Sequence, residues 1–194
     1  MQPAICVYSS SSDVVAAPYF AAAEALGAAL AAHGYTLVYG GARIGLMGAV
    51  ARATHAHGGR VVGIIPQVIY DKGLSYPEAD ELIITRDLRE RKALLDARAT
   101  AFVALPGGFG TLEEIVEILT LRQLQVHTRP IILLNTLGFY EPLLALFEHF
   151  YRERFAKPHR ALYHVAADVP DIFAFLVDYQ PQPLADKWFD PARP

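Results

Sequence analysis

Residues 105–114, LPGGFGTLEE, combine three glycines with a threonine and two adjacent carboxylates. The stretch follows a short apolar run and precedes an amphipathic one, which indicates a turn from a strand into a helix. Gly107, Gly108 and Gly110 let the backbone turn sharply and let a ligand approach main-chain N–H groups with no Cβ in the way. Thr111 is expected at the N-cap of the following helix, whose free N–H groups attract an anion. This glycine turn therefore predicts a phosphate site.

The same turn also has a purely structural interpretation. Thr111 and Glu114 have the spacing of a capping box, in which the carboxylate only satisfies an N-terminal N–H. The helical positions argue for more. Glu113 lies on a polar flank with Glu117 and Thr120, whereas Glu114 shares its stripe with apolar side chains. A carboxylate on an apolar stripe, at the mouth of a glycine turn, needs a partner or a chemical role.

Three cations fall within one helical turn just before the strand that leads into the glycine turn: Arg89, Arg91 and Lys92. The arginine guanidinium can donate two hydrogen bonds to phosphate oxygens, and the lysine ammonium attracts phosphate as a point charge. Asp87 and Glu90 have capping-box spacing, so we assign Glu90 a structural role. Arg91 falls on the apolar stripe of its helix. If its role is only structural, its guanidinium is expected to extend to solvent or to form an ion pair with Asp87. The cations, the turn and the embedded carboxylate fit a site for a sugar phosphate undergoing acid–base or oxocarbenium chemistry.

Short apolar runs alternate with helical patterns along the chain. The predicted strands are 4–8, 36–40, 60–66, 81–86, 100–105, 130–135 and 161–166, and the predicted helices are 16–34, 45–59, 87–98, 111–125, 139–155 and 170–179; residues 67–80 are expected as a loop. Strands that are apolar throughout indicate a parallel sheet covered on both faces. Right-handed crossovers then predict an α/β fold, a doubly wound, Rossmann-like three-layer sandwich. In such sheets ligands bind beyond the carboxyl ends of the strands, where the glycine turn falls.

The size of the chain, 194 residues, favours a single domain, which we place at 1–179, followed by a Pro-rich tail at 180–194. The tail is expected to lack regular structure, with Trp188 and Phe189 as candidates for docking on a partner subunit. A net charge of −3 and the lack of a basic stripe argue against nucleic acid as a partner.

A cytoplasmic location without a membrane contact is the expected setting. The single cysteine, Cys6, cannot form an internal disulfide, and the N-terminus has no basic leader followed by a long apolar region. The longest apolar candidate for a membrane span, residues 130–150, is interrupted by charged and helix-breaking residues. The seven histidines have no metal-ligand spacing, so we expect no metal.

Two stretches together closely resemble a family signature: LRERK at 88–92 and PGGFGTLEE at 106–114. They are similar to the paired motifs of the Lonely Guy-type cytokinin riboside 5′-monophosphate phosphoribohydrolases, in which a helix carrying MHERK precedes PGGxGTxxE. The blocks YGGARIGLMGAVA, RVVGIIP, LTLRQL, RPIILLN and GFY follow the family's order, so the resemblance covers residues 4–178.

This resemblance implies hydrolysis of the N-glycosidic bond of adenine-type nucleoside 5′-monophosphates, either N6-substituted cytokinin precursors or AMP, to the free base and ribose 5-phosphate. The family's catalytic pair maps onto Arg91 and Glu114. The expected substrate contacts are the phosphate cradle Gly107, Gly108, Gly110 and Thr111, the nucleotide contact Lys92, and Leu88, Glu113 and Thr120. No metal or organic cofactor is implied, and the family's assembly implies at least a homodimer.

The chain departs from the family pattern in three places. Leu88-Arg89 replaces Met-His, residues 9–12 read SSSS where CGSS is usual, and Ala42 replaces a third glycine. These differences affect the expected base specificity more than the chemistry, because the Arg91 and Glu114 positions and the phosphate loop are intact.

Three other functions are alternatives to nucleotide hydrolysis. A nucleotide or molybdenum-cofactor carrier on the same scaffold would bind without chemistry. An NAD-dependent oxidoreductase is disfavoured because the first strand–helix turn lacks GxGxxG. An amino-acid decarboxylase using pyridoxal phosphate needs a Schiff-base lysine, and none of the lysines (Lys72, Lys92, Lys157 and Lys187) lies in a convincing cofactor setting.

Overall fold

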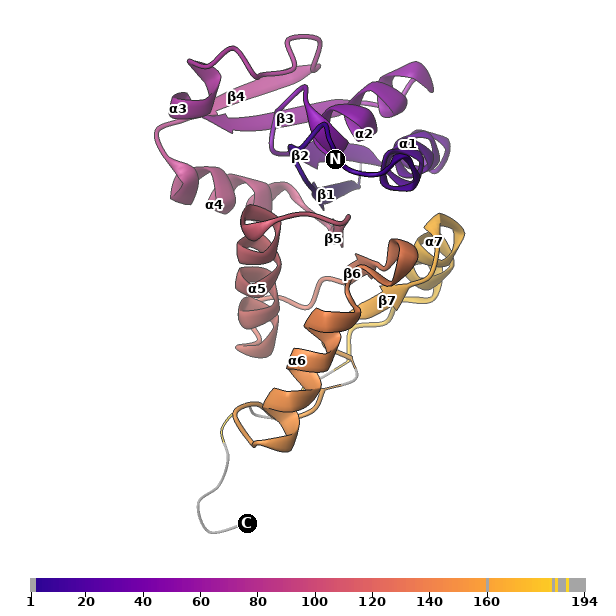
Figure 1. Cartoon of the computed structure of the whole chain (residues 1–194), viewed down its shortest axis with the longest axis vertical. Coiled ribbons are helices and arrows are strands. Elements are labelled where there is room, and N and C mark those ends of the chain that lie inside the picture. Colours follow the sequence, from indigo (N-terminus) through magenta and orange to yellow (C-terminus); the bar gives the residue numbers. More distant parts are fainter. Residues whose placement is uncertain (1–2, 160, 183, 185–187, 189–194) are drawn as a thin grey trace.

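The structure, a computed structural model, describes residues 3–159, 161–182, 184 and 188. Its strands are β1 (Ala4–Tyr8), β2 (Thr36–Tyr39), β3 (Val61–Pro66), β4 (Glu81–Thr85), β5 (Ala101–Ala104), β6 (Ile131–Leu134) and β7 (His164–Ala166). Its helices are α1 (Ala17–Ala32), α2 (Gly45–Ala56), α3 (Gln67–Tyr70), α4 (Leu88–Arg98), α5 (Phe109–Gln123), α6 (Glu141–Arg152) and α7 (Val169–Asp178), with a 3₁₀ turn, η1 (Thr136–Gly138). Within the described residues, seven parallel strands form one sheet in the order β4-β3-β2-β1-β5-β6-β7 (Figure 1).

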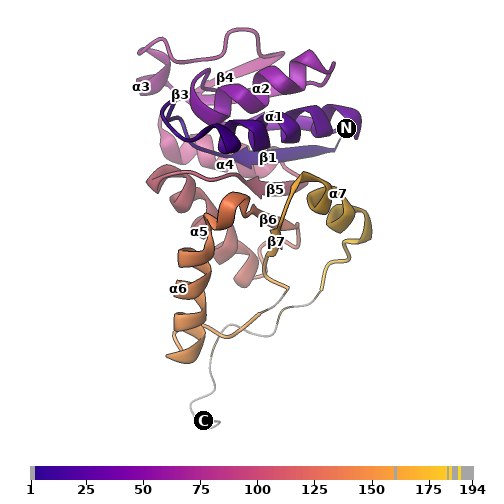
Figure 2. The ribbon, with the colours of Figure 1, turned by 45° about the vertical axis from the view of Figure 1, so that its right-hand side comes forward.

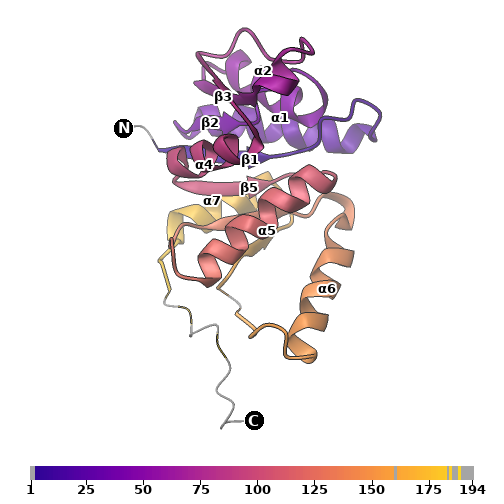
Figure 3. The ribbon, with the colours of Figure 1, turned by 90° about the vertical axis from the view of Figure 1, so that its left-hand side faces the viewer.

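Helices cover both faces of this sheet, which confirms the predicted three-layer α/β sandwich. Helices α1, α2 and α7 pack on one face, with the first two in front of the sheet in Figure 2. Helices α4, α5 and α6 pack on the other face, with α4 and α5 in front of β5 in Figure 3. Strands sandwiched in this way bury side chains on both faces, which explains why their sequences are apolar throughout.

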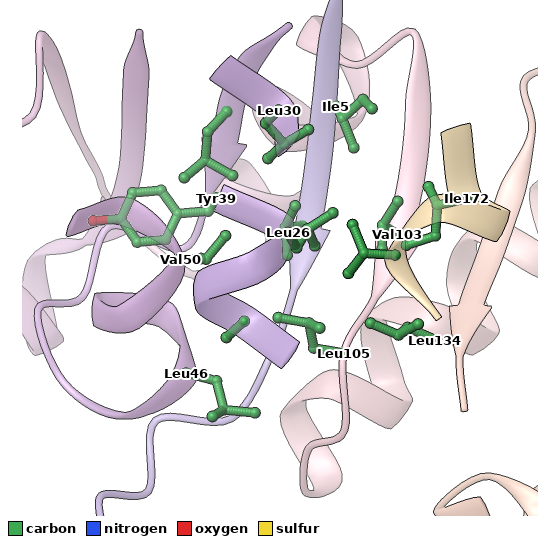
Figure 4. Close-up of a cluster of buried hydrophobic side chains, with 14 of the residues drawn as sticks. Ile5, Leu26, Leu30, Tyr39, Leu46, Val50, Val103, Leu105, Leu134 and Ile172 are labelled. Carbon is green, nitrogen blue, oxygen red and sulfur yellow. The ribbon is translucent and has the colours of Figure 1, made fainter. Parts of the chain in front are cut away.

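The core consists of two apolar clusters separated by the sheet. Alternation along β1 sends Ile5 and Val7 to the α1 face, and Cys6 and Tyr8 to the α4 face. Figure 4 shows the first cluster, in which Leu26 of α1 lies among strand side chains. Each such fully buried aliphatic side chain stabilises the fold by about 1.5–3 kcal/mol relative to an exposed one.

The predicted elements agree with the structure apart from their ends and one connection. The expected loop 67–80 begins with the short helix α3. Helix α6 begins at Glu141 instead of 139 and ends at Arg152 instead of 155, and Arg154 just beyond its end has a positive φ of 63° that a helix cannot contain. Strand β7 is shorter than the expected 161–166. In the tail, Leu184 is buried and Trp188 is exposed, whereas Phe189 lies outside the described residues.

The order of the strands creates a switch point between β1 and β5. From β1 the chain builds β2, β3 and β4 to one side, then returns to place β5 on the other side of β1. Tyr8 pairs with Ala104, so the turn after β1 lies beside the glycine turn after β5. Crevices beyond the carboxyl ends of strands at such a point are where open α/β sheets bind ligands.

Candidate functional site

The glycine turn leads directly into α5. The N-cap of this helix is Gly108 instead of the predicted Thr111. Thr111 is the third residue of the helix and is buried. A Cβ at Gly107 would lie 2.1 Å from the Thr111 Oγ1, so only glycine allows the turn to pack on the threonine. Because Gly108 has no side chain to accept them, the N–H groups of the first turn of α5 are available to an anion.

Two oppositely charged side chains meet between α4 and α5. The Arg91 Nη2 donates a hydrogen bond to the Glu114 Oε1, and the side chains are 9% and 6% exposed. Arg91 therefore neither extends to solvent nor bridges to Asp87, which instead caps α4 by accepting from Arg89 N and Glu90 N. Thr111 and Glu114 therefore do not form the predicted capping box, because the N-cap is Gly108.

The environment of Glu114 perturbs its acidity. Burial raises the pKa of this carboxyl above its ordinary value, and the Arg91 guanidinium opposes the rise. The Arg91 Nε is also buried and has no hydrogen-bond partner among the described residues. Buried donors in folded proteins are nearly always satisfied, so this N–H is available to a ligand that enters the site.

A second charged cluster adjoins this pair at the surface. The Lys92 Nζ binds the carboxylate of Glu113 and lies 2.8 Å from the Glu117 Oε2. Hydrogen bonding to Glu113, and then to Glu117, raises the pKa of Lys92. Thr120 is not brought into this cluster, because its hydroxyl donates to the Val116 carbonyl at 2.7 Å and it lines a separate pocket against α6. Leu88 begins α4 with its side chain exposed.

The crevice between α4 and α5 forms a pocket of about 200 Å³. Glu114 lines it together with Arg89, Lys92 and Tyr8. Tyr8, the last residue of β1, is 5% exposed and was not predicted as a site residue from the sequence. Its ring stacks on Phe102 with centroids 6.2 Å apart, so it forms the floor of the crevice. The alternation along β1 was the available signal, since it places Tyr8 on the face covered by α4 and α5.

Two further residues support the pair and the turn. Gly40, the residue after β2, borders the pair: a Cβ there would be in ordinary contact with the Arg91 Nη2 at 3.5 Å and in tight contact with the Met47 Sδ at 3.1 Å. The buried Tyr140 donates from its hydroxyl to the Leu105 carbonyl at 2.7 Å, immediately before the glycine turn. Tyr140 was also missed, although it belongs to the GFY block.

The described residues contain neither a cluster of metal ligands nor a helix that could span a membrane. In that part of the chain, no group of three or more His, Cys, Asp or Glu side chains is placed to hold a metal ion. Likewise, none of the described helices has the length and apolar character that crossing a membrane requires.

Comparison with known proteins assigns the chain to a family. A family described as "Possible lysine decarboxylase" matches residues 47–176. "Probable cytokinin riboside 5'-monophosphate phosphoribohydrolase LOGL5" of Oryza sativa subsp. japonica is 40% identical over 180 residues, covering 92% of this chain and 73% of the rice protein. "Cytokinin riboside 5'-monophosphate phosphoribohydrolase LOG5" of Arabidopsis thaliana is 39% identical over 178 residues, covering 91% and 78%. The chain belongs to the LOG family.

The structural neighbours share the fold of this LOG protein. The molybdenum cofactor carrier protein of Chlamydomonas reinhardtii superposes with a TM-score of 0.70 at 25% identity, covering 91% of this chain and 96% of the carrier. The molybdenum cofactor binding protein of Rippkaea orientalis gives a TM-score of 0.69 at 20% identity, covering 91% and 96%. At such identities the likeness concerns the arrangement of strands and helices.

The two LOG motifs converge in space. ERK belongs to α4, and PGGxGTxxE spans the glycine turn and the first two turns of α5. Their arginine and final glutamate are Arg91 and Glu114, which bind each other across 23 residues of sequence.

Proposed function

We propose that this LOG protein hydrolyses the N-glycosidic bond of adenine-type nucleoside 5′-monophosphates to the free base and ribose 5-phosphate. The rice and Arabidopsis relatives that carry the phosphoribohydrolase name match over nine-tenths of the chain. The observation that carries the proposal is the buried Arg91–Glu114 pair beside the glycine turn. A reactive carboxylate held out of water at a phosphate-binding turn is what cleavage of a sugar phosphate requires.

The phosphate is anchored by the first turn of α5. A Cβ at Gly108 or at Gly110 would meet no atom within 4 Å, so a ligand can approach the backbone at both positions. The N–H groups and the helix dipole favour a dianion there. Glu114 lies one helical turn further along α5, which sets the ribose of the bound nucleotide against its carboxylate.

The chemistry follows the charge that develops on the sugar. As the bond between the anomeric carbon and the base nitrogen breaks, its electron pair moves to the base and positive charge grows on the ribose ring. The Glu114 carboxylate stabilises that charge and accepts a proton from the water whose oxygen bonds to the anomeric carbon. Glu114 then releases this proton, the departing base takes one up, and the carboxylate is regenerated. Arg91 orients the carboxylate and keeps it ionised, and general-base assistance of this kind contributes about 10²–10⁴-fold to rate.

Decarboxylation fits the pocket less well than hydrolysis. A Schiff base with pyridoxal phosphate forms from a neutral lysine amine. Lys92 is the lysine that lines the pocket, and its pKa is raised by Glu113 and Glu117, which hold it as an ammonium ion. The carrier function is also weaker, because a protein that only binds a nucleotide has no need for a buried ion pair at the turn.

We further propose that AMP and N6-substituted nucleotides are both substrates, and that the active assembly is a homodimer. Exposed apolar side chains on α5 and α6 support the dimer, because together they offer an apolar surface on which a second copy could pack. They are Phe109, Leu112, Val116, Leu146 and Phe150. Size-exclusion chromatography with light scattering would test this assembly, and a monomer at micromolar concentration would contradict it.

The direct test of the function is product analysis. Purified protein is incubated with AMP and with N6-isopentenyl-AMP side by side, and the mixtures are separated by chromatography. Free adenine or isopentenyladenine together with ribose 5-phosphate is the expected result. Recovery of intact nucleotide from a protein that binds it would identify a carrier instead.

A further inference from the structure

We propose that the chain has a second binding site, for a small organic anion, at the amino ends of the strands, whereas the glycine turn lies at their carboxyl ends. A cavity of about 450 Å³ lies there, between the start of β6, the start of β7 and the end of α7. Its lining includes Arg122, Ile131, Tyr163, His164, Phe175 and Tyr179. A volume of this size is within the range of small-molecule sites. The glycine turn follows the carboxyl end of β5, whereas this cavity adjoins the amino ends of β6, which pairs with β5, and of β7, which pairs with β6, so the two sites are separate.

A buried charge marks this cavity. Arg122, in the last turn of α5, is 2% exposed. Its guanidinium donates to the Tyr179 hydroxyl at 3.1 Å and to the carbonyls of His127 and Gln182 at 3.3 and 3.4 Å. All three acceptors are neutral, and no carboxylate of the described residues lies within 4 Å of the guanidinium nitrogens.

This arrangement differs from that of Arg91, the other buried arginine among the described residues. Arg91 is neutralised by Glu114, as buried charges usually are. The carbonyl end of α5 offsets part of the Arg122 charge through the helix dipole, but a dipole supplies only about half an elementary charge. An arginine that is buried with no counter-ion among the described residues, and that lines a cavity large enough for a ligand, is suited to receive an anion from solution.

The walls of the cavity indicate the class of anion. A guanidinium fork matches the two oxygens of a carboxylate or of a phosphate monoester. The rings of Phe175 and Tyr179 lie 5.4 Å apart at a steep angle, and with Tyr163 they offer apolar surface for a flat organic group. Asp178 also lines the cavity and disfavours dianions. A small aromatic monocarboxylate therefore fits the site better than an aromatic phosphate.

Calorimetry on the full chain tests this site with benzoate, phenyl phosphate and the neutral analogue benzamide. We expect benzoate to bind at least about tenfold more tightly than benzamide, because the hydrogen bonds to Arg122 are charge-assisted. Arg122→Gln should abolish that preference, while Arg152→Gln, at an exposed arginine on α6, should retain it. Hydrolysis of AMP should be unchanged in both variants. Equal affinities for benzoate and benzamide in the wild-type chain would overturn the proposal.

Two further measurements apply if Arg122→Gln does not fold. Asp178→Asn keeps every hydrogen bond of Arg122 and removes a negative charge from the cavity, so it should tighten benzoate binding severalfold. Benzoate added to the ¹⁵N-labelled wild-type chain should shift the amide signals of His164 and Phe175. Shifts confined to residues 107–111, or an Asp178→Asn variant that binds benzoate no better, would contradict a site at Arg122.

Discussion

The Arg91 guanidinium and the Glu114 carboxylate form an ion pair beneath the glycine turn, with both side chains more than nine-tenths excluded from solvent. Ion pairs in such places are rarely a source of net stability, since apolar side chains of the same volume are often equally stable there. The pair also connects two helices at the point where the sheet's topology opens a crevice. The proposed chemistry on a bound nucleotide would account for its location.

Removing one member of the pair should destabilise the fold. Arg91→Met leaves the Glu114 carboxylate buried without its counter-ion, which costs about 3–5 kcal/mol in the free energy of unfolding. Urea denaturation measures this loss. Arg89→Met, on the neighbouring exposed position of α4, is the matched control and should change the free energy by less than about 0.5 kcal/mol. Equal stability of the two variants would show that the ion pair is not a coupled buried unit.

The activity should depend on the ionisation of Glu114. Burial raises the pKa of this group, so its carboxylate form is lost at a higher pH than for an ordinary glutamate as the solution is acidified. Consequently kcat/KM should fall with decreasing pH along a limb whose midpoint lies above the usual value of about 4.3. Rates measured between mildly acidic and neutral pH, at constant ionic strength, give this midpoint. A limb at or below the ordinary value would contradict Glu114 as the ionising group.

Two adjacent glycines of the turn should respond differently to alanine. At Gly107 the new methyl would lie 2.1 Å from the Thr111 Oγ1, so the first turn of α5 must move. Gly107→Ala should lower the melting temperature and abolish nucleotide binding. At Gly108 the methyl meets no atom within 4 Å and φ is −91°, so stability should persist while KM rises, because the methyl enters the ligand's space. Identical behaviour of the two variants would contradict this geometry.

Tyr140 should act on the glycine turn from outside the pocket. Tyr140→Phe removes the hydrogen bond to the Leu105 carbonyl and costs about 1 kcal/mol of stability. Because the turn begins at the next residue, we expect KM for the nucleotide to rise more than kcat falls. Steady-state kinetics separates the two effects. A fall in kcat with unchanged KM would place Tyr140 in the chemical step instead of in positioning the turn.

Much of the fold was predictable because it depends on local patterns. Continuous apolar strands alternating with amphipathic helices define a doubly wound sheet, and the motifs selected Arg91 and Glu114. What the patterns could not give was the contact between those two residues, since it depends on how α4 and α5 pack on the sheet. The observed N-cap, Gly108, lies three residues before the predicted one, and Thr111 is instead buried in the first turn of the helix against Gly107.

Other parts of the site depended on tertiary contacts that no local spacing encodes. Tyr8 forms the floor of the crevice only because β5 returns beside β1. The sequence pattern therefore predicts Tyr8 as a strand residue but not as part of the site. Thr120 was selected from its helical position beside Glu117, but its hydroxyl turns to the Val116 carbonyl. The pocket extends along α5 to Leu121, past Thr120, and Thr120 lies outside it because its side chain is on the side of α5 that faces α6.

The most direct test is the turnover of Glu114→Gln compared with the wild-type chain, using AMP and N6-isopentenyl-AMP at saturating concentration. Glutamine preserves the size of the side chain and removes its charge, so the stabilisation of the ribose cation and the proton acceptor are both lost. We expect kcat to fall by at least about 10²-fold while nucleotide binding is retained. Near-normal release of base by Glu114→Gln would contradict it.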